Sequence, residues 1–224
     1  MMTQEQAGDM QARQPVPAPV PPPTPTLAPG SIYSDEEVRW LGPWQRIRQA
    51  TLGPVALVLS RLGLSANMLS IASVLCGLGF FLLATVQFDI AFWLLVASIL
   101  CDGLDGVEAR LTKTNTARGA FTDTFCDQLV VALSVAGLAW KGLIHPVLGI
   151  LFVYIYTALV TFLVLHKLQR VSSAWLVRPS RMLLYTAVGL YFFFSVNILN
   201  YLLMVYLLAF PLVFLSFWRL RKAM

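Results

Sequence analysis

The sequence predicts an all-α integral membrane protein with six transmembrane helices, preceded by an amphipathic juxtamembrane helix on the membrane surface. Of the 224 residues, 58% are hydrophobic and only 12% are charged, about half the charged share of a typical soluble domain. Six apolar segments each approach the ~20 residues that cross a bilayer core. The net charge of +5 follows the ends of these segments. We therefore expect membrane lipids, and no nucleic acid, as partners.

The chain divides into three parts by composition. Residues 1–33 contain eight prolines between Pro15 and Pro29, which exclude regular helix and predict a disordered, proline-rich tail. Residues 34–62 mix tryptophans with arginines, as in a helix that lies in the headgroup region. Residues 63–224 contain the six spans and form the predicted catalytic domain.

The predicted spans alternate in direction and place both termini on the same side. Their expected limits are 66–86, 89–111, 118–140, 144–166, 182–199 and 201–218. Of the 16 lysines and arginines, every one except Lys141 then lies on the side of the termini. The positive-inside rule makes that side cytoplasmic.

Four aspartates interrupt the second and third apolar segments near their predicted cytoplasmic ends. Asp102 and Asp105 are three residues apart, and Asp123 and Asp127 are four apart, so each pair shares one helix face. The short connection makes the two helices antiparallel neighbours, and the four carboxylates are expected to converge. Carboxylates this close need cations to stay ionised, and an all-oxygen set suits Mg²⁺ or Mn²⁺. Two such ions could clamp a phosphate group.

Small residues accompany the aspartates. Gly106 lies one turn after Asp102, and Gly119 lies one turn before Asp123. Close helix packing is one explanation, since it is common in membranes. The other is room for a base or a pyrophosphate beside the metal ions.

The aspartates belong to a longer pattern with eight fixed positions. The pattern is Asp102-x-x-Asp105-Gly106-x-x-Ala109-Arg110, eight further residues, and Gly119-x-x-x-Asp123-x-x-x-Asp127. It resembles the signature of the CDP-alcohol phosphotransferase family in residue types and in spacing. The six-helix layout with a preceding surface helix is also similar to that family, so the likeness extends over residues 34–220.

The resemblance implies a reaction in which the hydroxyl of a second alcohol displaces CMP from a CDP-linked alcohol and forms a phosphodiester. It implies that Asp102, Asp105 and Asp123 bind two metal ions, Mg²⁺ or Mn²⁺. Asp127 would be both a metal ligand and the general base on the incoming hydroxyl. The resemblance also implies a homodimer.

The resemblance further implies a donor site around the cytidine and its phosphates. The positions that it indicates are Gly106, Ala109, Arg110, Thr116, Gly119 and Asn67. Thr112 and Thr114 compete with Thr116 for the hydroxyl contact to the donor. Asn67 lies in "LSAN", where relatives have L-T-P-N, and helix capping is the alternative for this residue.

The acceptor site is less defined. The segment 166–181 carries basic residues on the cytoplasmic side, of which Arg178 and Arg181 are three apart. They either set the orientation of the protein or bind a phosphate or carboxylate of the acceptor. The segment lacks the arrangements expected of a glycerophosphate-using or a serine-using relative, so the acceptor is left open.

The favoured hypothesis is a phosphotransferase of phospholipid synthesis in a bacterial inner membrane, with CDP-diacylglycerol as the donor. A CDP-choline or CDP-ethanolamine donor with a lipid acceptor is an alternative. A second class is a transporter that uses the aspartates as a cation or proton relay. Transporter sites tend to lie near the bilayer midplane between inverted repeats, and neither feature is present in the sequence. A third class, an inert scaffold, does not account for the complete set of aspartates.

Overall fold

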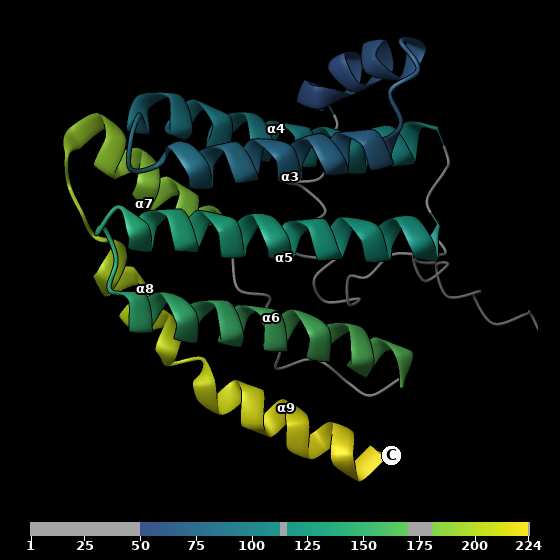
Figure 1. Cartoon of the computed structure of the whole chain (residues 1–224). Helices are drawn as coiled ribbons and strands as arrows, with labels where there is room; N and C mark the ends of the chain where they lie inside the picture. The colour runs from purple at the N-terminus through teal and green to yellow at the C-terminus, as the bar shows by residue number, and fades with distance from the viewer. Residues whose placement is uncertain (1–49, 113–115, 170–180, 224) are drawn as a thin grey trace, which may run out of the picture.

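The computed structural model describes residues 50–112, 116–169 and 181–223 (Figure 1). A first helix occupies Ala50–Arg61. Seven helices follow: α3 (Ala66–Leu83), α4 (Phe88–Leu111), α5 (Ala117–Trp140), α6 (Pro146–Leu168), α7 (Arg181–Phe194), α8 (Leu199–Leu207) and α9 (Phe210–Ala223). The described residues contain no strand. The predicted all-α class is therefore confirmed.

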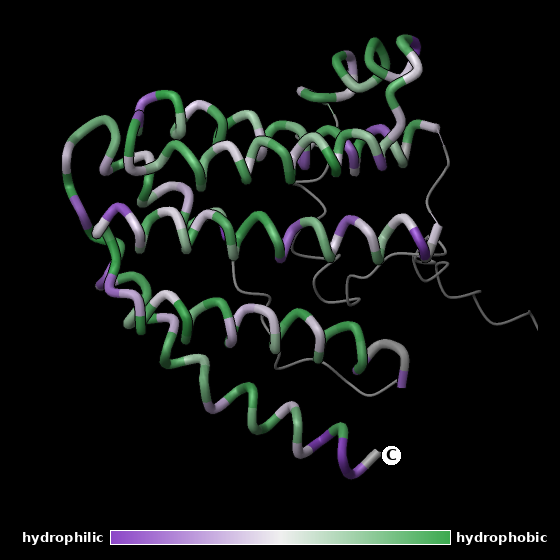
Figure 2. Tube along the Cα trace, viewed as in Figure 1, coloured by the Kyte–Doolittle hydropathy of each residue, from purple (hydrophilic) through white to green (hydrophobic). Residues whose placement is uncertain are grey.

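The helices α3 to α6 run alongside one another as long rods, with α7, α8 and α9 completing the bundle (Figure 1). Five segments are long and apolar enough to cross a membrane: α3, α4, α5, α6 and the stretch Leu199–Lys222, which contains α8 and α9. Hydrophobic residues dominate these helices, and hydrophilic ones gather toward helix ends (Figure 2). The chain is an integral membrane protein by this criterion, and α7, with 14 residues, is shorter than a full span. The sixth crossing stays a prediction.

The fifth predicted span, 182–199, is shorter than expected because α7 stops at Phe194. Ser195 has a φ of 57°, in the left-handed region that interrupts a right-handed helix. Asn197 then stabilises the turn, because its Oδ1 accepts the N–H of Leu199 (3.1 Å) and its Nδ2 donates to the carbonyl of Leu143 (2.9 Å). These bonds begin α8 and attach the turn to the α5–α6 connection.

The sixth predicted span, 201–218, is divided into α8 and α9. Pro211 has no N–H to donate to the carbonyl four residues earlier, and its ring would clash with that carbonyl in a continuous helix. The chain instead forms tighter turns, in which the N–H of Leu208 donates to Val205 and the N–H of Ala209 donates to Tyr206. The prediction of one unbroken helix was wrong at this point.

The helix α3 packs along both α4 and α5. Small residues allow the close approach of α3 and α5: a Cβ added at Gly137 would lie 3.2 Å from the Cα of Phe81, and one added at Gly77 would lie 3.3 Å from Val130. Without a hydrophobic force between helices in lipid, close packing of this kind stabilises the bundle. The α3–α5 contact therefore fixes the position of α5 along the bundle axis relative to α3 and α4.

The predicted surface segment 34–62 is described only from residue 50 onward, and the predicted tail 1–33 lies outside the described residues. Leu52, Ala56 and Leu59 of the helix Ala50–Arg61 pack with buried residues of α3 and α4. Leu104 and Val107 of α4 belong to this small cluster, and they flank Asp105 in the sequence. The first helix thus covers the outer side of the aspartate-bearing end of α4. Its position along a membrane surface stays a prediction.

Candidate active site

The aspartates lie where α4 ends and α5 begins. Asp102 and Asp105 are in the last turns of α4, and Asp123 and Asp127 are in the first turns of α5. Thr116 caps α5, because its Oγ1 accepts the N–H of Gly119 at 3.0 Å. A side-chain cap of this kind satisfies one of the free N–H groups of the first turn and fixes where the helix starts. The start of α5 in turn fixes where Asp123 and Asp127 lie along the length of α4.

Three of the four aspartates form a compact group. One carboxylate oxygen from each of Asp102, Asp123 and Asp127 lies within 4.8 Å of the others. Asp127 is 5% exposed, and Asp102 and Asp123 are half-buried. Three carboxylate oxygens at this spacing, with no sulfur or nitrogen ligand among them, fit a hard divalent cation such as Mg²⁺ or Mn²⁺.

The remaining aspartate makes a separate contact. Asp105 is 4% exposed, and its Oδ2 accepts a hydrogen bond of 2.6 Å from the Oγ of Ser70 on α3. It is not a member of the group of three oxygens that the described residues bring together. The bond to Ser70 ties the aspartate-bearing end of α4 to α3 and holds the Asp105 carboxylate in one orientation.

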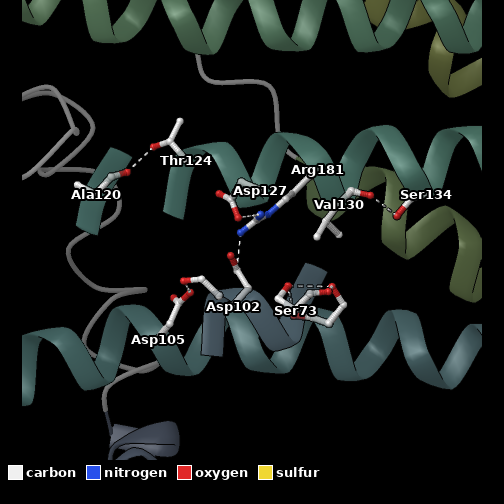
Figure 3. A network of polar contacts seen from close by, with 11 residues as sticks. Ser73, Asp102, Asp105, Ala120, Thr124, Asp127, Val130, Ser134 and Arg181 are labelled. Atoms are coloured by element: carbon white, nitrogen blue, oxygen red, sulfur yellow. Dashed lines mark hydrogen bonds and ion pairs between the residues drawn. The ribbon is translucent and has the colours of Figure 1, made fainter. Parts of the chain in front are cut away.

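Arg181, the first residue of α7, lies between the two aspartate-bearing helices (Figure 3). Its Nη1 donates to Asp127 Oδ1 and its Nη2 donates to Asp102 Oδ2, so one guanidinium bridges α4 and α5. The Arg181 side chain is 18% exposed and that of Asp102 is 11% exposed. Charge-assisted bonds at such burial are stronger than surface ion pairs.

A narrow crevice continues from this ion pair into the bundle. Its lining consists of Ser73, Ser98, Ile99, Asp102, Val130, Arg181 and Tyr185. The hydroxyl oxygens of Ser73 and Ser98 lie 2.9 Å apart, and each also lies within hydrogen-bond distance of the other residue's backbone carbonyl, so the two hydroxyl protons are shared among these contacts. The hydroxyl of Tyr185 is buried and has no hydrogen-bond partner in the described part of the chain. The crevice is too narrow for a water molecule in this conformation, so it is a polar gap between the helices and not an open pocket.

The predicted donor positions lie at the ends of three helices, α3, α4 and α5. Gly106 and Ala109 are half-buried in the last two turns of α4, and Gly119 is half-buried in the first turn of α5. Thr116 is exposed, and its capping bond is its observed contact. Asn67 is exposed in the first turn of α3, whose N-cap residue Ser65 makes no side-chain capping bond. Donor contacts at all these positions stay predictions.

Two predicted arginines cannot be placed. Arg178 lies outside the described residues, and so does the side chain of Arg110, although its backbone belongs to α4. Arg181 contacts two of the predicted metal ligands, and its predicted contact with the acceptor stays a prediction.

Sequence reasoning missed the polar residues that line and support the site. Ser98 precedes Asp102 by four residues, and Tyr185 follows Arg181 by four, so each lies on the same helix face as a predicted site residue. Ser70 and Ser73 are three apart on the opposing helix α3. Polar side chains at helical spacing from a predicted ligand were the signal that could have identified them.

Comparisons with known proteins give matches to one family. A model of the CDP-alcohol phosphatidyltransferase family matches residues 63–215. Two curated relatives, each a CDP-diacylglycerol–serine O-phosphatidyltransferase from a strain of Helicobacter pylori, are 42% and 41% identical to the chain over 71 residues. These matches cover 31% of the chain and span 29% of the length of each relative. No solved structure matches the chain significantly.

Proposed function

Because the chain belongs to the CDP-alcohol phosphatidyltransferase family, we propose that it is a phosphotransferase of phospholipid synthesis that transfers a phosphatidyl group from a CDP-linked lipid to the hydroxyl of a small alcohol. The convergence of Asp102, Asp123 and Asp127 at one end of two apolar helices carries this proposal. The family match favours it over the transporter alternative.

The residues of the site would divide the reaction between them. Asp102, Asp123 and Asp127 would hold a divalent cation, with Asp105 as a ligand to a second one. Bound cations would offset the charge of the carboxylates and of the donor diphosphate. Asp127 is the most buried member of the three-oxygen group, which suits a base that takes a proton out of contact with water.

The proposed step conserves atoms and charge. The acceptor oxygen forms a bond to the phosphorus that carries the lipid, the bond from that phosphorus to the oxygen of CMP breaks, and CMP leaves. The acceptor proton passes to Asp127. The products are a phosphodiester lipid and CMP, with no oxidant or reductant required.

The donor that we propose is CDP-diacylglycerol, and L-serine is the first acceptor to test. Both compounds appear in the names of the two relatives. The test is CMP release from purified protein in mixed micelles with CDP-diacylglycerol, Mn²⁺ and either L-serine, glycerol 3-phosphate or inositol, with the lipid product identified by mass spectrometry. CMP release with one acceptor supports the proposal. Absence of CMP release from CDP-diacylglycerol with every acceptor would overturn it, and so would CMP release only from CDP-choline or CDP-ethanolamine with a lipid acceptor.

Arg181 and Arg178 are proposed to bind an anionic group of the acceptor. Arg181 lines the crevice beside the aspartates, together with the hydroxyl of Tyr185. A guanidinium matches a carboxylate or phosphate with two parallel bonds, which an ammonium group cannot reproduce. We expect Arg178→Lys combined with Arg181→Lys to raise the KM for the acceptor about tenfold while the KM for the CDP-linked donor changes little. Unchanged KM values for both substrates would mean that the two arginines only set the orientation of the protein in the membrane.

The membrane orientation and assembly belong to the same proposal. We propose an inner-membrane location in a bacterium, with the site and both termini in the cytoplasm, and a homodimer. The basic residues Arg221 and Lys222 in the last turn of α9 fit a cytoplasmic end under the positive-inside rule. Labelling of single cysteines introduced at Lys141 and at Lys222 in intact cells would test the orientation.

A further inference from the structure

Arg181 lies at the end of α7 where a positive charge is unfavourable. It is the first residue of α7, and the N-terminus of a helix carries partial positive charge that disfavours a cation. The compensation comes from other helices, because its guanidinium bridges Asp127 of α5 and Asp102 of α4 (Figure 3). The side chain therefore has its charge partners in the aspartate group and not in α7.

The guanidinium uses the same carboxylates that a metal ion would use. Asp102 and Asp127 are two of the three residues whose oxygens lie within 4.8 Å of one another. A divalent cation between these oxygens would lie about 2.0–2.6 Å from each. A guanidinium bridging the same two carboxylates would then be a second cation at close range, where like charges repel strongly in a partly buried site. The guanidinium and a divalent cation would therefore compete for these two carboxylates.

We propose that Arg181 supplies the positive charge between Asp102 and Asp127 in the metal-free protein and moves off these carboxylates when a divalent cation binds. The inference rests on the metal site of the proposed function and adds a coupling to it. The guanidinium offsets part of the charge of the two carboxylates in the first state, and the divalent cation offsets it in the second. The long side chain of arginine allows the exchange by rotation about its own bonds, without a shift of α7.

The exchange links metal binding to the crevice. Arg181 lines the crevice together with Asp102 and Tyr185, so a guanidinium released from the aspartates stays close to the reaction site of the proposed function. The released guanidinium can bind an anionic group of the acceptor. The guanidinium that is paired with the aspartates cannot. Metal binding and acceptor binding therefore each raise the affinity for the other.

The affinity for Mn²⁺ in the absence of both substrates tests the exchange. Free Mn²⁺ is measured by electron paramagnetic resonance during titration of the purified full-length protein. Arg181→Gln removes the competing cation and is expected to bind Mn²⁺ about tenfold more tightly, within the range usual for coupled sites. Arg181→Lys keeps the positive charge but loses the two parallel N–H groups of the guanidinium. Its affinity for Mn²⁺ is expected to lie between those of the unmodified protein and Arg181→Gln. Arg221→Gln, at an exposed position in the last turn of α9, removes the same charge elsewhere and should bind as the unmodified protein does.

Thermal stability gives a second measurement that does not depend on turnover. In chelator, Arg181→Gln leaves Asp102 and Asp127 without this partner and should lower the Tm; in saturating Mn²⁺ the difference from the unmodified protein should largely disappear. A purely structural ion pair would lower the Tm equally in both conditions, and that result would overturn the inference. So would an unchanged or weaker affinity of both Arg181 variants for Mn²⁺. Failure of the unmodified protein to bind Mn²⁺ at all would instead overturn the metal site of the proposed function.

Discussion

The helices α4 and α7 meet at two places that are chemically opposite. Where α4 begins and α7 ends, aromatic rings pack: Phe92 stacks on Phe192 with 4.0 Å between the ring centroids and 8° between the planes, and Phe88 meets Tyr191 edge to face. Where α4 ends and α7 begins, Asp102 pairs with Arg181. One pair of helices thus forms an apolar end and a charged end.

The comparison indicates which end supplies stability and which supplies chemistry. The aromatic end is held mainly by ring packing, with Lys141 Nζ 4.6 Å from the centroid of the Phe88 ring, so its stability should depend little on divalent cations. The aspartate end has buried carboxylates that depend on a cation, either Arg181 or a metal ion. Substitutions at the two ends should therefore separate into effects on unfolding and effects on turnover.

Removal of divalent cations should have the largest effect, and only at the aspartate end. Excess EDTA is expected to abolish CMP release, because the carboxylates then have no ion with which to bind the donor diphosphate. Added Mg²⁺ or Mn²⁺ should restore it. Full CMP release in excess chelator would show that the carboxylates act without metal ions.

Asp127→Asn should have the next largest effect. The amide has the shape of the carboxylate, and its oxygen can still accept a bond from Arg181, so the fold should persist. It cannot take a proton from the acceptor, and loss of a general base alone typically slows turnover by about 10²–10⁴-fold. The measurement is kcat for CMP release, together with binding of the CDP-linked lipid, which should be retained.

Asp89→Asn is the matched control for this substitution. Asp89 is exposed in the first turn of α4, at the aromatic end of the same helix. Near-normal turnover of Asp127→Asn, or an equal loss for Asp89→Asn, would contradict the assignment of Asp127 as the base.

Phe92→Ala should affect unfolding and leave the metal dependence of turnover unchanged. Phe92 is 6% exposed, and the substitution leaves a cavity against Phe192, which typically costs about 3 kcal/mol or more in a packed core. We expect a lower Tm in detergent at every Mn²⁺ concentration, with the Mn²⁺ requirement of the remaining activity unchanged. Ile90→Ala, at a 51% exposed position on the same helix, should have a smaller effect on the Tm. A changed Mn²⁺ requirement in Phe92→Ala would show that the two ends are not independent.

The aspartate end was the part of the structure that could be predicted most fully from the sequence. Carboxylates are so costly in an apolar span that their spacing has few explanations, and the spacing of Asp123 and Asp127 on α5 placed them opposite Asp102. Arg181 was predicted as a site residue, but its pairing with those carboxylates was not. The partner of a long side chain depends on how three helices meet in space, and the sequence pattern along one helix does not contain that information.

The helix breaks were predicted less well. A hydropathy pattern averages over a whole span, so the interruption at Ser195–Asn197 and the division before Pro211 were both lost in continuous apolar segments. Pro211 was a visible signal that was not used. The turn at Asn197 depends on a bond to Leu143 in a distant connection, which no local pattern would have indicated.

Ser70→Ala should have the smallest effect and sharpens the comparison at a single hydrogen bond. The Oγ of Ser70 donates to Asp105 Oδ2 at 2.6 Å, and both residues are buried. If Asp105 is a metal ligand, loss of this bond frees its carboxylate to turn and should raise the Mn²⁺ concentration for half-maximal activity about tenfold, the lower end of what supporting residues of metal sites contribute. Ser70→Thr keeps the hydroxyl and should restore a near-normal Mn²⁺ requirement.

Ser73→Ala is the matched control, because it removes a buried hydroxyl one turn along α3 that bonds Ser98 in place of a carboxylate. An equal shift for Ser70→Ala and Ser73→Ala would mean that α3 acts through packing alone. An unchanged Mn²⁺ requirement for Ser70→Ala would remove Asp105 from the metal site.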